Sequence, residues 1–351
     1  MAFFKPDEFN IVMDNPDTGQ DKYRPEFSSH ALKLDELKAL RDAGAQTVLE
    51  FHQCAETARG VYDWSLTDEA VERCRKAGMK VLLMGPTTVP QWCPDDWYVW
   101  GADGTVFKDH DKREIVQTWG CLSPWNDTAM GYLEDYIAKV CNRYAGDDVL
   151  CAYSYSQEGE SMLPPAAGAV YDPAALASYR EWIGDKRLSP DVRSGNTQRW
   201  MYERLCNTML YQQDVYQRRN KHDDLFISLH PCYWGWPGSG VYGIEPYIRA
   251  ILDELKPSHL YHIVFSLLVP AFDFAWGFID DMMRLGVEYI CGSEWPEGLL
   301  TNSQRAATCG IRALLTAPTH PYKHRDTLEP WMVDAFKQSR SIFAQREVVT
   351  A

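Results

Sequence analysis

The chain has 351 residues, 45% of them hydrophobic and 24% charged, which suits a globular protein with one large core. Its formal net charge of −14 argues against nucleic acid and other polyanions as partners. The sequence has no apolar run of about 20 residues, so we expect no membrane partner. It shows no signal peptide, which predicts a cytoplasmic protein, or a secreted or periplasmic one if a signal has been removed. The ten cysteines show no CxxC pair, and we expect most of them to be reduced and buried.

Strand-like and helix-like segments alternate along the chain. The expected strands are 9–13, 46–51, 80–84, 149–155, 225–229, 260–268, 287–291 and 313–316, the last being the least distinct. The expected helices are 31–43, 66–76, 130–144, 199–220, 244–255, 278–285, 303–313 and 328–345. Repeated βα units require a parallel sheet, and this number of units favours closure. We therefore predict an α/β fold, a single (β/α)8 TIM barrel domain over 1–351 with long βα loops. An open doubly wound sheet is the alternative.

Two glutamates follow short apolar runs that are expected to be strands. Glu158 comes after 149–155, and Glu294 comes after 287–291. Side chains at the carboxyl ends of barrel strands converge on one mouth, so these two carboxyls are expected to face each other there. Such a pair is the chemical requirement of a glycoside hydrolase. Taken singly, each residue also has a structural interpretation without catalysis. Glu158 would be part of an acidic loop, and Glu294 would cap the following helix.

Several other polar and aromatic residues lie where they can contact a sugar. The nearest alternatives to the pair are Glu160, two residues after Glu158, and Glu297, further into the loop after Glu294. The candidate substrate-binding residues beside the pair or at the ends of other strands are Gln157, Trp295, Glu50, His52, His230, Tyr233 and Trp234. The loop after 80–84 contains Trp92, Trp97 and Trp100, which we expect to include a stacking surface for sugar rings.

Metal chemistry has weak support in the sequence. None of the nine histidines forms an HxH or HExxH pattern, and His320 and His324 straddle a proline. We therefore predict no metal and no cofactor. A barrel hydrolase or lyase that uses a metal with His230 or His262 remains an alternative, and insensitivity to chelators would count against it.

One stretch carries a specific resemblance. Residues 48–65, with Glu56, Gly60 and Asp63, resemble the second-strand region of glycoside hydrolase family 42 β-galactosidases, where Glu-Pro-x-x-Gly-x-Tyr-Asp-Phe-Ser leads into the second helix. The similarity continues through the third strand and its Pro-Thr-rich loop at 76–92. It extends to the Asp-Gly turn at Asp103-Gly104, to Arg143-Tyr144, and to the segment that ends in Gln157-Glu158.

The resemblance, clearest over 40–160, implies clan A of the glycoside hydrolases. It implies a barrel with the acid/base on the fourth strand, here Glu158, and the nucleophile on the seventh, here Glu294, with net retention of configuration. The usual Asn before the acid/base is Gln157 in this chain. The resemblance also suggests galactose as the sugar. Relatives of this kind often form trimers or dimers, which leaves a homo-oligomer open.

The leading hypothesis is thus a retaining, β-galactosidase-like enzyme that cleaves β-glycosidic bonds in a carbohydrate substrate. An endo-acting β-glycanase of the same clan would use the same two carboxyls. A non-catalytic carbohydrate-binding barrel is the alternative from another class. Activity that disappears when Glu294 is removed separates the enzyme from the binding protein.

Overall fold

The computed structural model describes the strands of the barrel and several of the helices and loops around them. These segments are 10–15, 33–51, 55–84, 90, 92–107, 122–155, 168–219, 225–228, 261–266, 288–293, 299–309, 313–316, 328 and 330–350. The expected helices at 244–255 and 278–285 lie outside the described residues.

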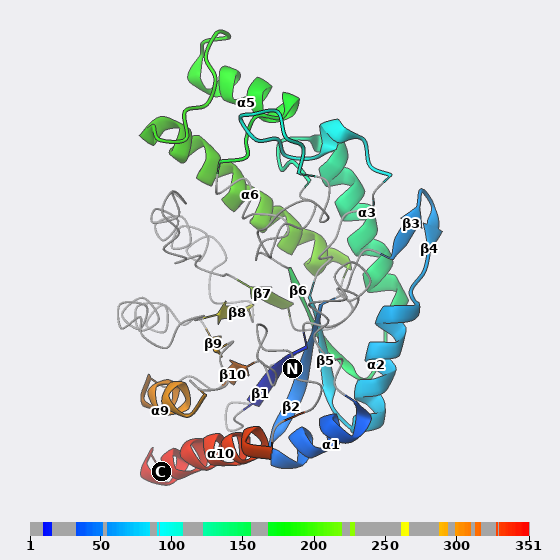
Figure 1. Cartoon of the computed structure of the whole chain (residues 1–351), viewed down its shortest axis with the longest axis vertical. Helices are drawn as coiled ribbons and strands as arrows, with labels where there is room; N and C mark the ends of the chain where they lie inside the picture. The colour runs from blue at the N-terminus through cyan, green and yellow to red at the C-terminus, as the bar shows by residue number, and fades with distance from the viewer. Residues whose placement is uncertain are drawn as a thin grey trace.

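Eight parallel strands pair in a closed ring, in the order β1-β10-β9-β8-β7-β6-β5-β2. They are β1 (Asn10–Asn15), β2 (Ala45–Phe51), β5 (Lys80–Met84), β6 (Leu150–Tyr155), β7 (Leu225–Ser228), β8 (Tyr261–Ser266), β9 (Glu288–Ser293) and β10 (Ala313–Thr316). The ring closes because β1 pairs with β2 on one side and with β10 on the other. Figure 1 views the molecule roughly along the axis of this ring, with the strands at the centre and the helices around them. All strands therefore end on one side of the barrel.

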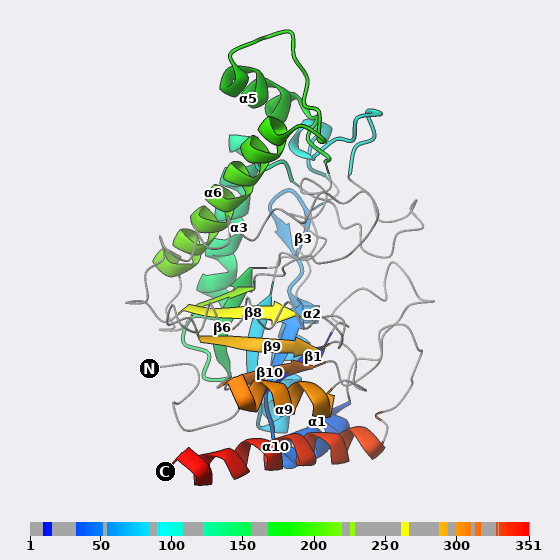
Figure 2. The ribbon, with the colours of Figure 1, turned by 90° about the vertical axis from the view of Figure 1, so that its left-hand side faces the viewer.

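The described helices alternate with the strands in sequence and lie outside them. They are α1 (Leu34–Ala43), α2 (Ser65–Ala77), α3 (Asp127–Arg143), α5 (Pro173–Ile183), α6 (Gly195–Arg219), α9 (Leu299–Cys309) and α10 (Pro330–Thr350). In the side view of Figure 2, α9 and α10 run alongside the strands β9 and β10. The predicted bounds of β5 and β10 match the observed ones. The helix expected over 303–313 begins and ends earlier, because its last residue, Ala313, already belongs to β10.

Local sequence explains where the helices begin and end. Gly44 has φ 118° and Gly78 has φ 74°, a left-handed conformation that glycine adopts without strain, and each ends a helix. A β-carbon at Gly44 would also lie 2.8 Å from Cδ of Arg340. Asn126 caps α3 by accepting hydrogen bonds from the backbone N–H groups of Thr128 and Ala129.

The core lies between the strand ring and the helices. Val81, Leu82 and Leu83 are consecutive in β5 and all three have no exposed surface. Successive strand residues point to opposite faces, so this strand is buried on both, as in parallel sheets covered by helices. Leu37 of α1 and Phe336 of α10 belong to the same cluster, which joins the first and last described helices. Burying each such side chain stabilises the fold by about 1.5–3 kcal/mol.

Besides the one-turn 3-10 helix η3 (Asp95–Trp97), two described elements were not predicted from the sequence. The first is a short hairpin after β2, formed by β3 (Glu56–Ala58) and β4 (Val61–Tyr62). The second is α5, which begins after Asp172 with Pro173 as its first residue. An aspartate cap followed by proline is a helix-start signal. The predicted helices include none between 155 and 199, so this signal was overlooked.

The connection between β6 and β7 forms a lobe together with the residues just before α3. We define the lobe as residues 122–126 and 168–200, which include α5 and the first part of α6. In Figures 1 and 2 it extends well beyond the strands. Its centre is a stack of Trp125 on Trp200, with ring centroids 4.7 Å apart, and Tyr179 packs edge-on against Trp200 at 5.2 Å.

Within the described residues, helices long and apolar enough for a bilayer crossing are not found. Three cysteines in these residues, Cys74, Cys93 and Cys141, are buried free thiols, in line with the prediction for most cysteines. Burial raises the pKa of the Cys141 thiol to about 12.

Candidate active site

The structure describes the two strands that lead to the predicted carboxyl pair. β6 ends at Tyr155, three residues before Glu158, and β9 ends at Ser293, one residue before Glu294. Counted along the ring strands in chain order, β6 is the fourth and β9 the seventh. Both strands run in the same direction through the intervening β7 and β8. β6 and β9 therefore end on the same side of the barrel.

Most of the predicted site residues lie outside the described residues. These are Gln157, Glu158, Glu294 and Trp295, together with His52, His230, Tyr233 and Trp234. Glu160, Glu297 and His320 also lie outside them. Their roles stay predictions.

Glu50 is described through its backbone. It is the residue before the last in β2 and pairs with Asn15 of β1 and Leu83 of β5. This places Glu50 near the carboxyl end of the ring, on the same side as the ends of β6 and β9. Its contribution to substrate binding stays a prediction.

Trp92 is the described member of the predicted set whose side-chain contacts are known. It meets Trp97 edge-on at 6.0 Å and Tyr132 edge-on at 5.3 Å between ring centroids. Trp97 and Tyr132 are also neighbours, at 5.8 Å. Trp100, the third tryptophan of this loop, donates from Nε1 to the carbonyl oxygen of Asp95. The loop tryptophans thus pack on each other and on α3, and a further role in stacking on sugars stays a prediction.

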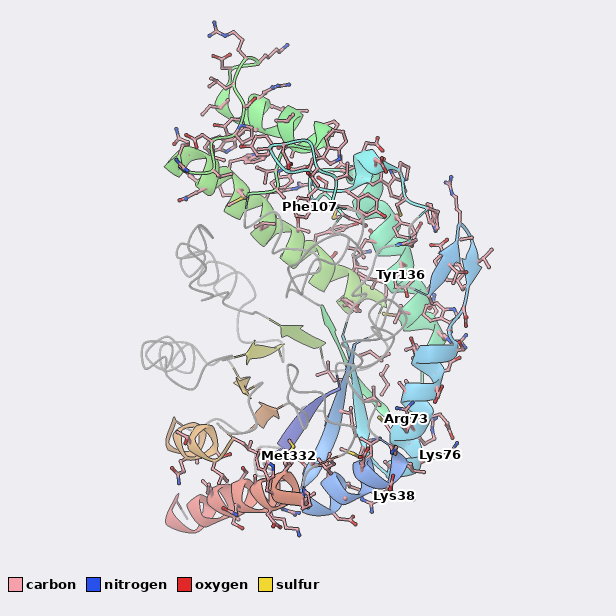
Figure 3. All side chains as sticks on the ribbon, viewed as in Figure 1. Lys38, Arg73, Lys76, Phe107, Tyr136 and Met332 are labelled. Atoms are coloured by element: carbon pink, nitrogen blue, oxygen red, sulfur yellow. The ribbon has the colours of Figure 1, made fainter. Side chains whose placement is uncertain are left out.

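A buried carboxylate that the sequence analysis did not select holds this region together. Glu56 is 4% exposed, and its Oε1 accepts a hydrogen bond from the backbone N–H of Gly60 at 2.5 Å. Its Oε2 accepts one from the hydroxyl of Tyr132 at 2.6 Å. Nearby, the Tyr136 hydroxyl accepts from the backbone N–H of Ala55, and Figure 3 shows Tyr136 on α3 beside the hairpin. Glu56 belongs to the motif that carries the family resemblance, so the motif was visible but its structural role was not.

Among the described carboxylates with displaced pKa values, Asp172 and Asp68 illustrate two different causes. Burial raises the pKa of Asp172, whose Oδ1 accepts hydrogen bonds from the Ser123 hydroxyl and the Ala175 backbone. The Arg143 guanidinium lowers the pKa of Asp68, with help from the Tyr144 hydroxyl. Both groups join structural elements: Asp172 binds Ser123 and the start of α5, and Asp68 binds the end of α3. In the described part of the chain, no three His, Cys, Asp or Glu side chains are grouped to hold a metal ion.

The closed ring of parallel strands defines a barrel protein whose candidate site is at the carboxyl ends. The sequence model of the β-galactosidase family, glycoside hydrolase family 42, matches residues 22–197, which is half of the chain. The chain belongs to glycoside hydrolase family 42. A search of curated proteins finds no match.

Solved β-galactosidases share the fold at low sequence identity. The enzyme from the psychrophilic Marinomonas ef1 is 12% identical with a TM-score of 0.63, and covers 97% of this chain and 60% of its own. The enzyme from Rahnella sp. R3 is 13% identical with a TM-score of 0.64, covering 99% and 58%. The family 42 enzyme from G. stearothermophilus is 14% identical with a TM-score of 0.62, also covering 99% and 58%. The chain thus spans about three fifths of the length of these structures.

Proposed function

We propose that this chain is a retaining glycoside hydrolase that cleaves β-glycosidic bonds on a complete (β/α)8 barrel. Its preferred sugar in this proposal is galactose, in line with the names of the family and of its solved structures. The single observation that carries the mechanism is the position of β6 and β9. They are the fourth and seventh strands of one parallel ring, and their ends directly precede the segments with Glu158 and Glu294.

Strand register supports a common orientation for the two carboxyls. Tyr155 of β6 pairs with Ile227, Ile227 with Ile263, and Ile263 with Tyr289 of β9. Residues that pair in this way lie on the same face of the sheet. Glu158 is three residues after Tyr155 and Glu294 is five residues after Tyr289. Both intervals are odd, so extended continuations of the two strands would present both glutamates on one face.

In the proposed mechanism, Glu294 attacks the anomeric carbon while the bond to the leaving oxygen breaks. Glu158 gives its proton to that oxygen. A water molecule then loses a proton to the Glu158 carboxylate, and its oxygen attacks the anomeric carbon and releases Glu294. Retention requires the two carboxyls to be about 5–5.5 Å apart. The nearby negative charge of Glu294 is expected to raise the pKa of Glu158, and the pKa should fall once Glu294 is glycosylated.

The test is hydrolysis of aryl β- and α-glycosides of galactose, glucose, mannose, xylose, arabinose and fucose. We expect hydrolysis of one β-glycoside, and the β-galactoside is the substrate that the proposal favours. Glu294→Ala should lower kcat on it at least about 10³-fold, because no covalent intermediate can form. Glu158→Ala should lose about 10²–10⁴-fold on poor leaving groups and little on very acidic ones, which leave without protonation.

Glu160→Ala and Glu297→Ala are the matched controls, since each removes a glutamate close in sequence to one of the proposed pair. Both should keep activity within about threefold. Added azide distinguishes the roles further. With Glu294→Ala it should attack the free anomeric face and give a glycosyl azide of inverted configuration. With Glu158→Ala it should intercept the glycosyl-enzyme and give the retained product. Equal loss of activity on all substrates in both variants would disprove the role assignment. A wild type that binds the sugar but hydrolyses none of the glycosides would favour a binding protein.

A further inference from the structure

The hairpin after β2 carries an arginine, Arg59, that lies over the ring of a tryptophan, Trp92. The guanidinium carbon of Arg59 lies 5.7 Å from the centroid of the Trp92 ring. We call Arg59 with the partly exposed Trp92, Trp97 and Tyr132 the Arg59 rim. The hairpin follows the carboxyl end of β2, and Trp92 follows that of β5, so the rim is on the same side of the barrel as the predicted site. In Figure 1 the hairpin lies beyond α3, away from the barrel axis.

A buried carboxylate fixes the position of Arg59. Glu56 precedes the turn that contains Arg59, and it accepts hydrogen bonds from the backbone N–H of Gly60 after Arg59 and from the Tyr132 hydroxyl on α3. Gly60 has φ 78°, which closes this tight turn without steric strain. The same Tyr132 ring packs edge-on against Trp92. The backbone under Arg59 and the ring beneath its guanidinium are therefore held by one connected set of contacts.

Within the described segments, the Arg59 rim contains hydrogen-bond donors that have no partner. Most described arginines form ion pairs with carboxylates, among them Arg41, Arg73, Arg75, Arg143, Arg187, Arg199, Arg204, Arg218 and Arg219. Arg59 forms no ion pair among the described residues, although the net charge of the chain is −14. Trp92 Nε1 is buried and meets no acceptor in the same part of the chain. The polar groups that this rim leaves unpaired are thus hydrogen-bond donors.

The Arg59 guanidinium lies over the Trp92 indole and forms no ion pair among the described residues, so its N–H groups are available to a ligand. The fork of N–H groups on a guanidinium binds a planar or tetrahedral oxyanion with two parallel hydrogen bonds. The adjacent aromatic edges offer apolar surface for a sugar ring. We infer that the Arg59 rim is a distal subsite for a sugar that bears a carboxylate or sulfate group, within a longer saccharide substrate. This inference rests on the proposed function in taking a saccharide as the ligand.

The test is calorimetric titration of the whole chain with three probes at low salt. Digalacturonate carries carboxylates, galactose 6-sulfate carries a sulfate, and galactobiose is the neutral disaccharide. We expect at least one charged probe to bind about tenfold more tightly than galactobiose, a difference of about 1.4 kcal/mol. The preference should shrink in 0.5 M NaCl, because the guanidinium is exposed to screening.

Arg59→Gln should abolish the preference for the charged probe, and Arg59→Lys should retain part of it because the charge stays while the fork is lost. Arg193→Gln is the matched control, since Arg193 is exposed and has no ion pair among the described residues. It should bind all probes as the wild type does. Thermal unfolding of each variant checks that the fold is intact.

Binding of digalacturonate alone would assign the carboxylate, and binding of galactose 6-sulfate alone would assign the sulfate. Equal affinity of the wild type for charged and neutral probes would overturn the inference. So would a preference that survives in Arg59→Gln, or one that is lost equally in Arg193→Gln. Hydrolysis of a neutral aryl β-galactoside should be unchanged in Arg59→Gln. A failure of the proposed function would appear separately, because the wild type would then not hydrolyse that neutral substrate.

Discussion

The contact between α2 and α3 and the contact within the lobe are each joined by an aspartate, and the two aspartates behave oppositely. Between α2 and α3, the partly exposed Asp68 accepts hydrogen bonds from Arg143 and from Tyr144. Within the lobe, Asp172 is fully buried, and the donors that it binds in the described part of the chain are neutral, among them Ser123. The first pKa is lowered by an opposite charge, and the second is raised by desolvation. Charged partners thus dominate one contact, and burial dominates the other.

The largest effect should come from the aromatic stack of the lobe. Trp200 is 3% exposed and contacts both Trp125 and Tyr179. Trp200→Ala should lower the free energy of unfolding by about 3–5 kcal/mol, because it leaves a cavity between two rings. Denaturant unfolding followed by circular dichroism measures this. Trp331→Ala, at a tryptophan that is 39% exposed, is the control and should cost about 0.5 kcal/mol or less. Equal losses would mean that the lobe has no core of its own.

The contact between α2 and α3 should respond much less to substitution. Both side chains of the Asp68–Arg143 pair are about two fifths exposed, so solvent screens their attraction. A double-mutant cycle with Asp68→Asn and Arg143→Gln should give a coupling of about 0.2–1 kcal/mol. Arg143 also stacks on Trp64, at 5.3 Å, so Arg143→Gln alone should cost more than the cycle shows. A coupling of several kcal/mol would show that the pair is effectively buried.

Salt should separate the two contacts. The Asp68–Arg143 coupling is expected to fall to less than half in 1 M NaCl, where charges are screened over about 3 Å. The cost of Trp200→Ala should not decrease under the same conditions, because it comes from packing. Repeating both unfolding measurements at low and high salt tests this. A coupling that is insensitive to salt would contradict the electrostatic account of this contact.

The smallest and most specific effect is the opposite pH dependence of two isosteric variants. The lowered pKa of Asp68 means that its stabilising contribution is present above its unfolded pKa and is lost as pH falls. The deficit of Asp68→Asn at pH 7 should therefore shrink below about pH 4. The raised pKa of Asp172 means that the wild type loses stability as pH rises from the unfolded pKa through the folded one. Asp172→Asn should gain relative stability over that range. Parallel pH profiles for the two variants would contradict the comparison.

Much of the barrel could be predicted because its signals are local. The bounds of β5 and β10 follow from short apolar runs between breaking residues, and Gly44 and Gly78 mark helix ends. The hairpin after β2 was missed because strands of three and two residues carry too little pattern. For the candidate site, the sequence predicts Glu158 and Glu294, which lie outside the described residues, and Trp92, whose role in sugar binding stays a prediction. It did not identify Glu56 as the carboxylate that anchors the rim.

The alternation of strands and helices, the family motif, and the positions of two glutamates after the fourth and seventh strands can all be read from local sequence. Which residues meet depends on how the elements pack. Tyr132 and Glu56 are 76 residues apart, Arg143 and Asp68 are 75 apart, and Ser123 and Asp172 are 49 apart. Whether a carboxylate is charged or suppressed depends on those distant partners and on the water that packing removes. The local sequence pattern shows neither the distant partners nor the removal of water. The order of strands and helices therefore predicts the barrel, and the packed structure determines the chemistry of each side chain.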